Sequence, residues 1–218
     1  MTCALREKQK LAEAGYENVG VAFNASPELL VHSDFFDRLV WEADNANIDD
    51  AQITIEVLET PDFGNLAEGS PQASSIRQLY DAGFQIHLDD FGVCFAGLSH
   101  LATLNVTGVK LDRSLVGELS VNPMSQKIVR KIIELSNDLS LSVIAEGVED
   151  AGTVLVLQSM GCNVVQGYWL ARPMPASALL SWLEVRRRHQ SRERAELCLS
   201  SSIEPLPVSL IGAVVPVA

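Results

Sequence analysis

Side chains that could bind metal ions occur at six places along the chain, each directly after an apolar run. The polar residues at these places are Asn24, Glu56 with Glu59, Asp89 with Asp90, Lys110 with Asp112, Glu146 with Glu149, and Gln166. Carboxylate and amide oxygens are the ligands that Mg²⁺ and Mn²⁺ prefer. Carboxylates that share a pocket repel one another unless cations neutralise them. If these residues meet in space, the pattern predicts one acidic, metal-binding site.

The apolar runs alternate with amphipathic segments, which is typical of repeated strand–helix units and a parallel sheet. The sequence predicts six strands, at residues 19–23, 53–58, 84–88, 108–111, 142–145 and 164–170. It predicts helices at residues 4–14, from 26 onward, and at 73–82, 97–104, 124–139, 151–160 and 175–188. The expected fold is therefore α/β, a TIM-like (β/α) barrel. In such a barrel the carboxyl ends of the strands meet at one mouth, where active sites are built.

Asp89 and Asp90 set a geometric condition on this site. Neighbouring residues on a strand point to opposite faces of the sheet. Both carboxylates can therefore face one site only if the strand ends before them, which is why we expect the third strand to stop at residue 88.

The composition limits the class of partner and the compartment. A net charge of −12 argues against duplex nucleic acid as a partner, because that binding draws on clustered Lys and Arg. Neither a disulfide framework nor a zinc-ligand spacing is present among the cysteines, which are Cys3, Cys94, Cys162 and Cys198. Reduced thiols and a cytoplasmic location are expected. The histidines show no ligand spacing and are interpreted as structural or solvent-facing: His32, His87, His100 and His189.

The two ends of the chain give no sign of export or of a membrane span. Residues 1–10 lack the apolar core of a signal peptide. Residues 206–218 are apolar, but they contain Pro207 and Pro216 and fall short of the ~20 residues that a spanning helix needs. We expect residues 1–190 to form one barrel domain and residues 191–218 a C-terminal tail.

Six short segments together resemble one known family. They are FNAS at 23–26, IEVLET at 55–60, DDFG at 89–92, VKLD at 109–112, AEGVE at 145–149 and QGYWLARPMP at 166–175. In this order they resemble the EAL family of cyclic di-GMP phosphodiesterases, from about residue 20 to residue 183. One such motif is weak support, whereas six in order at expected strand ends are strong.

The resemblance implies a site with two Mg²⁺ or Mn²⁺ ions that hydrolyses cyclic di-GMP to the linear dinucleotide. The residues that match the family's metal ligands are Asn24, Glu56, Asp89 and Asp90. Lys110 matches the lysine beside the attacking water and the phosphate, and Glu146 matches the proposed general base. The residues that match supporting positions of the site are Asp112, Glu149, Gln166 and Glu59.

Two departures from the family pattern bear on activity. The Glu-Ala-Leu motif, which supplies one more metal ligand, does not occur in the sequence. We therefore expect a barrel that lacks its first strand–helix unit at the N-terminus, slow turnover, and a free strand edge through which a homodimer could form. The second departure is Cys94, at a place that the family usually gives to glycine.

Three functions remain open from the sequence. The first is a metal-dependent hydrolase of cyclic di-GMP. The second is a degenerate domain that binds cyclic di-GMP or a partner protein without turnover. The third is another barrel enzyme that uses carboxylates and Mg²⁺ on a different substrate, because a fold alone does not define a reaction.

Overall fold

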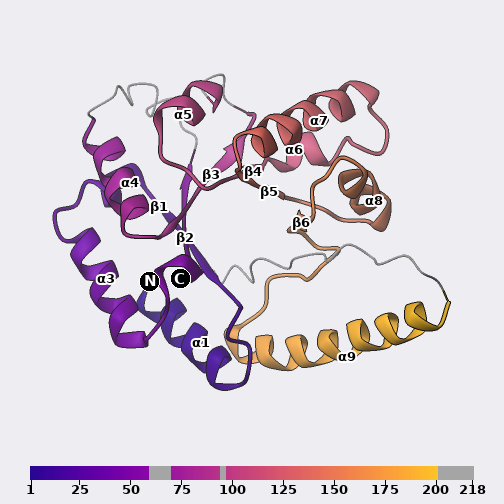
Figure 1. Ribbon diagram of the computed structural model, residues 1–218, viewed down its shortest axis with the longest axis horizontal. Coiled ribbons are helices and arrows are strands. Elements are labelled where there is room, and N and C mark those ends of the chain that lie inside the picture. Colours follow the sequence, from indigo (N-terminus) through magenta and orange to yellow (C-terminus); the bar gives the residue numbers. More distant parts are fainter. Residues whose placement is uncertain (59–69, 94–96, 201–218) are drawn as a thin grey trace.

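The computed structural model describes residues 1–58, 70–93 and 97–200 (Figure 1). Its elements follow in the order α1 (Thr2–Glu13), β1 (Val21–Ala25), α2 (Pro27–Leu30), α3 (Phe35–Ala46), the 3-10 turn η1 (Asp50–Gln52), β2 (Ile53–Leu58), α4 (Pro71–Asp81), β3 (Gln85–Phe91), α5 (Gly97–Thr103), β4 (Gly108–Leu111), α6 (Arg113–Val116), α7 (Pro123–Asp138), β5 (Ser142–Ala145), α8 (Ala151–Ser159), β6 (Val164–Val165) and α9 (Ala176–Ser200). No helix in these ranges is both long and apolar enough to cross a bilayer.

The strands form one parallel sheet in sequence order, from β1 to β6. Helices follow the strands and lie around the outside of the sheet (Figure 1). This is the strand–helix arrangement of a TIM-like barrel, so the expected fold class and the expected six strands are confirmed. Within the described residues, β1 and β6 are the edge strands and do not pair with each other.

The two faces of the sheet differ in chemistry because alternate residues of a strand point to opposite sides. One face is apolar and packs against the helices. Its buried strand residues include Phe23, Ile55, Val57, Leu88, Val109 and Leu111, which share a core with Leu39, Ile76 and Ile133 of the helices. The residues between them are polar at several positions. Thr54, Glu56, His87, Asp89 and Lys110 are all buried, so the inner face carries the chemistry.

Local signals account for most helix starts. Ser26 precedes Pro27 and its hydroxyl accepts a hydrogen bond from the amide of Leu29, as expected for an N-cap before a first-turn proline. Asn122 caps α7 in the same way, through the amides of Met124 and Ser125. The apolar period of α7 then buries Val129 and Ile133 in the core that the helices share with the sheet.

Strand β3 runs through Phe91, so the expectation that it ends at residue 88 is wrong. The register slips between Leu88 and Phe91: Leu88 pairs with Val109, and Phe91 pairs with Leu111. Phe91 is three residues after Leu88 on β3, whereas Leu111 is only two residues after Val109 on β4. This difference is a β-bulge of one residue. Asp90 is the extra residue, with φ of 54° in the left-handed region that Asp tolerates better than most residues. The strand does not need to end, because the bulge frees Asp90 from the alternation.

The C-terminal part differs from its sequence-based expectation. The last strand covers only Val164–Val165 and not residues 164–170. Beyond it the chain turns, since the amide of Trp169 donates to the carbonyl of Val148 and that of Leu170 to Gly167. The last helix extends to Ser200, twelve residues past the expected end at 188. It therefore crosses position 190, where we place the end of the barrel domain. Residues 201–218, the greater part of the expected tail, lie outside the described residues.

Candidate functional site

The ammonium group of Lys110 lies at the centre of three carboxylates on the inner face. Its Nζ is 2.7 Å from Oε1 of Glu146, 2.9 Å from Oδ1 of Asp89 and 3.0 Å from Oε2 of Glu56. Lys110 itself is only 2% exposed. These ion pairs are shielded from water, so removal of one partner would leave a buried charge unpaired.

The parallel register explains why residues so far apart in sequence meet. Glu56 on β2 pairs with His87 on β3, and His87 pairs with Gly108 on β4. Asp89 and Lys110 each lie two residues further along, on the same face and toward the carboxyl ends. Glu146 directly follows β5, whose last residue is Ala145. The predicted mouth of the barrel is thus where the cluster lies.

Burial and charge act in opposite directions on these groups. Burial lowers the pKa of Lys110, but Glu56, Glu146 and Asp89 outweigh it, and the net pKa is raised. The lysine is therefore charged at neutral pH. Burial raises the pKa of Glu56 and of Glu146, and the opposing effect of Lys110 cancels only part of that rise.

Three carboxylates form a group that could hold a metal ion. One oxygen from each of Asp89, Asp90 and Glu146 lies within 4.8 Å of the others. The donors are all oxygens, which fits hard divalent cations such as Mg²⁺, Mn²⁺ or Ca²⁺. Burial, followed by the charge of Asp89, raises the pKa of Asp90. A cation here would relieve the repulsion that this rise reflects.

The remaining predicted site residues lie around this cluster. Asn24 on β1 pairs with Glu56 in register, and its side chain is exposed. Asp112 caps α6, where its Oδ1 accepts a hydrogen bond of 2.8 Å from the amide of Ser114. Burial raises the pKa of Asp112, but the hydrogen bonds from Ser114 outweigh it and the net pKa is lowered.

Glu149, Gln166 and Glu59 complete the predicted set. Glu149 is exposed just before α8. Gln166 is half-buried after β6, and its backbone amide donates to the carbonyl of Ala145 at 2.8 Å. Glu59 lies outside the described residues, as does Cys94. The structure therefore brings together Glu56, Asp89, Asp90, Lys110 and Glu146, with the other described residues nearby on the same strand ends.

A family model identifies the domain. The model described as the EAL domain matches residues 2–173, which is most of the chain. This chain belongs to the EAL domain family. Both the motif order and the positions of its charged residues on the strand ends now have a common explanation.

Relatives of this EAL domain are named for cyclic di-GMP. The cyclic di-GMP phosphodiesterase PdeR of Escherichia coli is 36% identical over 179 residues, which are 82% of this chain and 26% of PdeR. The chain spans about a quarter of the length of the curated relatives that it matches first.

Solved structures match as well. The EAL domain of Mycobacterium smegmatis DcpA is 29% identical with a TM-score of 0.77, over 84% of this chain and 81% of that one. Klebsiella pneumoniae BlrP1, solved as a complex with manganese and cyclic di-GMP, is 28% identical with a TM-score of 0.71, over 78% of this chain and 42% of that one.

One polar residue of this EAL domain escapes the sequence-based prediction. His87 is buried on the inner face, two residues before Asp89, and its Nε2 lies 3.3 Å from Oγ of Ser142. This buried contact agrees with the structural role expected for the histidine, but the sequence does not predict its partner on β5. The signal was the alternation itself, because a residue two positions before a site carboxylate shares its face of the strand.

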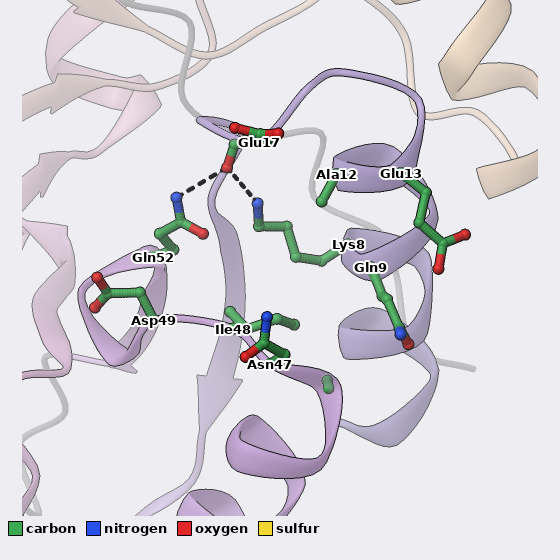
Figure 2. Close-up of a pocket in the computed structure, with 10 residues that line it drawn as sticks. Lys8, Gln9, Ala12, Glu13, Glu17, Asn47, Ile48, Asp49 and Gln52 are labelled. Carbon is green, nitrogen blue, oxygen red and sulfur yellow. Dashed lines mark hydrogen bonds between the residues drawn. The ribbon is translucent and has the colours of Figure 1, made fainter.

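A hollow of about 470 Å³ lies elsewhere in the EAL domain, beside the amino-terminal ends of β1 and β2. Figure 2 shows Lys8 and Gln52 pointing to the backbone oxygen of Glu17, with donor distances of 2.6 Å and 2.8 Å. Burial lowers the pKa of Lys8. In barrels this end serves stability, whereas reactions take place at the opposite end. We therefore place the functional site at the Lys110 cluster.

Proposed function

We propose that this chain hydrolyses cyclic di-GMP to the linear dinucleotide. The observation that supports it best is the buried Lys110 cluster, which combines a charged ammonium group with carboxylates at the strand ends. The names of the relatives and their bound ligands add the substrate class. The protein has a net charge of −12, and the cluster holds one ammonium group against three carboxylates, so bound metal ions would have to supply the positive charge that attracts a phosphodiester.

The residues divide into three roles under this proposal. Asn24, Glu56, Asp89 and Asp90 would hold two Mg²⁺ or Mn²⁺ ions. When bound, such ions polarise a phosphodiester and favour in-line attack by water. Lys110 would orient the phosphate and the water through N–H groups that are released when Glu56 and Asp89 hold metal ions, and Glu146 would accept the proton of that water. Supporting hydrogen bonds would come from Asp112, Glu149, Gln166 and Glu59.

Binding without turnover is the alternative, and one observation favours it. Lys110 contacts both Glu56 and Asp89, which are assigned to the metals. Metal binding must therefore compete with two short ion pairs. A chain of this kind could bind the messenger and act through a partner.

One assay separates the two functions. The full chain is incubated with cyclic di-GMP and Mn²⁺ or Mg²⁺, and chromatography follows the linear dinucleotide. Hydrolysis that requires the metal and that falls in Asp89→Asn supports the enzyme, with Asp81→Asn on the exposed end of α4 as the control. Calorimetric binding of cyclic di-GMP without any product would instead support the binding domain, and neither binding nor product would refute both.

Self-association and compartment follow from the same proposal. The outer edge of β1 pairs with no other strand of the described residues, and such edges invite pairing with another chain. We expect a homodimer through this edge, in the cytoplasm and without duplex nucleic acid. Light scattering should give twice the mass of one chain, and amide exchange along Val21–Ala25 should slow as protein concentration rises. A monomer at every concentration would contradict this.

A further inference from the structure

Three residues form a bridge across the inner face of the sheet, two residues before Asp89 and Lys110 on their strands. They are His87 on β3, Gly108 on β4 and Ser142 on β5, and we call them the His87 bridge. His87 pairs with Gly108 in register, and Gly108 pairs with Ser142. Nε2 of His87 and Oγ of Ser142 meet at 3.3 Å across the middle strand.

Gly108 is what allows the two side chains to meet. A Cβ at this position would lie 2.1 Å from Oγ of Ser142 and 2.8 Å from Cδ2 of His87. Non-bonded atoms do not approach so closely, so the imidazole and the hydroxyl occupy space that any other residue would fill. The bridge therefore depends on all three positions.

Ser142 determines which nitrogen of His87 carries the hydrogen. Its hydroxyl donates to the backbone oxygen of Thr107 at 3.2 Å. A hydroxyl has one proton, so toward His87 the Ser142 oxygen accepts, and Nε2 is the donor. When Nε2 carries the hydrogen of a neutral ring, Nδ1 is an acceptor.

Stability alone does not account for this histidine. Nδ1 is buried and has no hydrogen-bond partner in the described part of the chain. An unsatisfied buried acceptor is unfavourable, and an apolar side chain of similar shape would avoid it. Nδ1 thus adds no hydrogen bond that would explain a histidine here by folding free energy.

The bridge joins the three segments that carry Lys110 and two of its partners. His87 precedes Asp89 by two residues, Gly108 precedes Lys110 by two, and Ser142 precedes Glu146 by four. Residues at even spacing on a strand share a face.

We propose that His87 is a positioning residue that acts through Ser142. The contact between them would hold β3, β4 and β5 in the register that brings the carboxylates of Asp89 and Glu146 to Nζ of Lys110.

The test follows the ammonium group of Lys110 directly in the full chain. Lysine ¹H–¹⁵N correlation spectra should show a slowly exchanging Lys110 signal, assigned by its loss in Lys110→Met. We expect this signal to shift or disappear in His87→Leu and in Ser142→Ala, while the thermal midpoint of His87→Leu stays unchanged or rises. His87→Gln, which keeps an N–H donor, should retain the signal. Ser136→Ala, which removes a buried hydroxyl of α7, is the matched control and should also retain it.

The effect on turnover rests on the proposed function. With cyclic di-GMP and Mn²⁺, His87→Leu should lower kcat about 10- to 100-fold, as is typical when a residue behind a metal ligand is removed, with little change in KM. A Lys110 signal that is unchanged in both His87→Leu and Ser142→Ala overturns the positioning role, whether or not the parent is active. A parent without hydrolysis refutes the proposed function alone, because the spectra still decide the role of His87. If His87→Leu does not fold, Ser142→Ala, which loses only one hydroxyl, decides.

Discussion

Replacement of Glu146 by glutamine should lower the rate of cyclic di-GMP hydrolysis by about 10²- to 10⁴-fold, the range typical for loss of a general base. Glutamine keeps the length of the side chain but cannot accept a proton from water. Burial raises the pKa of the Glu146 carboxyl, and a pKa nearer neutrality suits a base that works at pH 7. Chromatography of the linear dinucleotide, relative to the parent chain, measures the loss.

The same variant distinguishes two roles for Glu146. Its oxygen lies near those of Asp89 and Asp90, where it could also bind a metal ion. Excess Mn²⁺ should recover part of the activity of Asp89→Asn, because that change weakens metal binding, but none of the activity of Glu146→Gln. Glu134→Gln, on the exposed face of α7, should behave like the parent. Equal recovery of both site variants by Mn²⁺ would show that Glu146 is a metal ligand and not the base.

Replacement of Lys110 by methionine should cost the metal-free protein about 3–5 kcal/mol of unfolding free energy, the usual effect of leaving buried charges without a partner. Methionine keeps most of the apolar stem. Glu56, Asp89 and Glu146 would then face one another with no cation between them. Urea denaturation in the presence of a chelator measures the change. Lys131→Met removes only an exposed ion pair with Glu134, and should cost at most about 1 kcal/mol.

This loss should grow with pH. The pKa values of Glu56 and Glu146 are already raised, first by burial, and Lys110 opposes that rise. Without Lys110 both values rise further. A carboxyl with a raised pKa in the folded state stabilises the fold below its unfolded pKa of about 4.3, and this contribution is lost as the pH rises through the folded value. The unfolding free energies of the variant and the parent should therefore differ least at about pH 4, close to the unfolded pKa of the carboxyls, and most above neutrality. An equal difference at both ends would contradict the account.

Local patterns predict the elements whose boundaries depend on local chemistry. The expected strands at residues 53–58, 108–111 and 142–145 match β2, β4 and β5, because each is an apolar run that ends at charged residues. Residues 166–170 are also expected in a strand, yet β6 ends at Val165 and the chain turns there. The amide of Trp169 donates to the carbonyl of Val148 in a separate segment, and no local pattern encodes that contact.

For the candidate site, too, the sequence predicts which residues lie at strand ends but not which side chains touch. The sequence indicates that Glu56, Asp89, Lys110 and Glu146 lie at strand ends, because each follows an apolar run. It does not indicate that one ammonium group contacts three of these carboxylates, since that depends on side-chain lengths and register. Nor does it reveal the His87 bridge, which requires a glycine on the strand between the two partners.

The bulge at Asp90 also governs what happens to the chain after it. In an unbroken alternation Asp90 would face the helices and the ring of Phe91 would point into the barrel. The extra residue reverses the parity of the strand, so that Phe91 pairs with Leu111 and is buried to 2% exposure on the apolar side. Deletion of Asp90 is therefore a different event from its substitution. Asp90→Ala removes one carboxylate and keeps the extra residue, whereas deletion of Asp90 would remove the carboxylate and the bulge together and would leave Phe91 opposite Leu111 in an unbroken alternation. Asp90 thus contributes to the site in two separate ways. Its carboxylate lies at the site, and its backbone is the extra residue that sets which face of the sheet Phe91 points to.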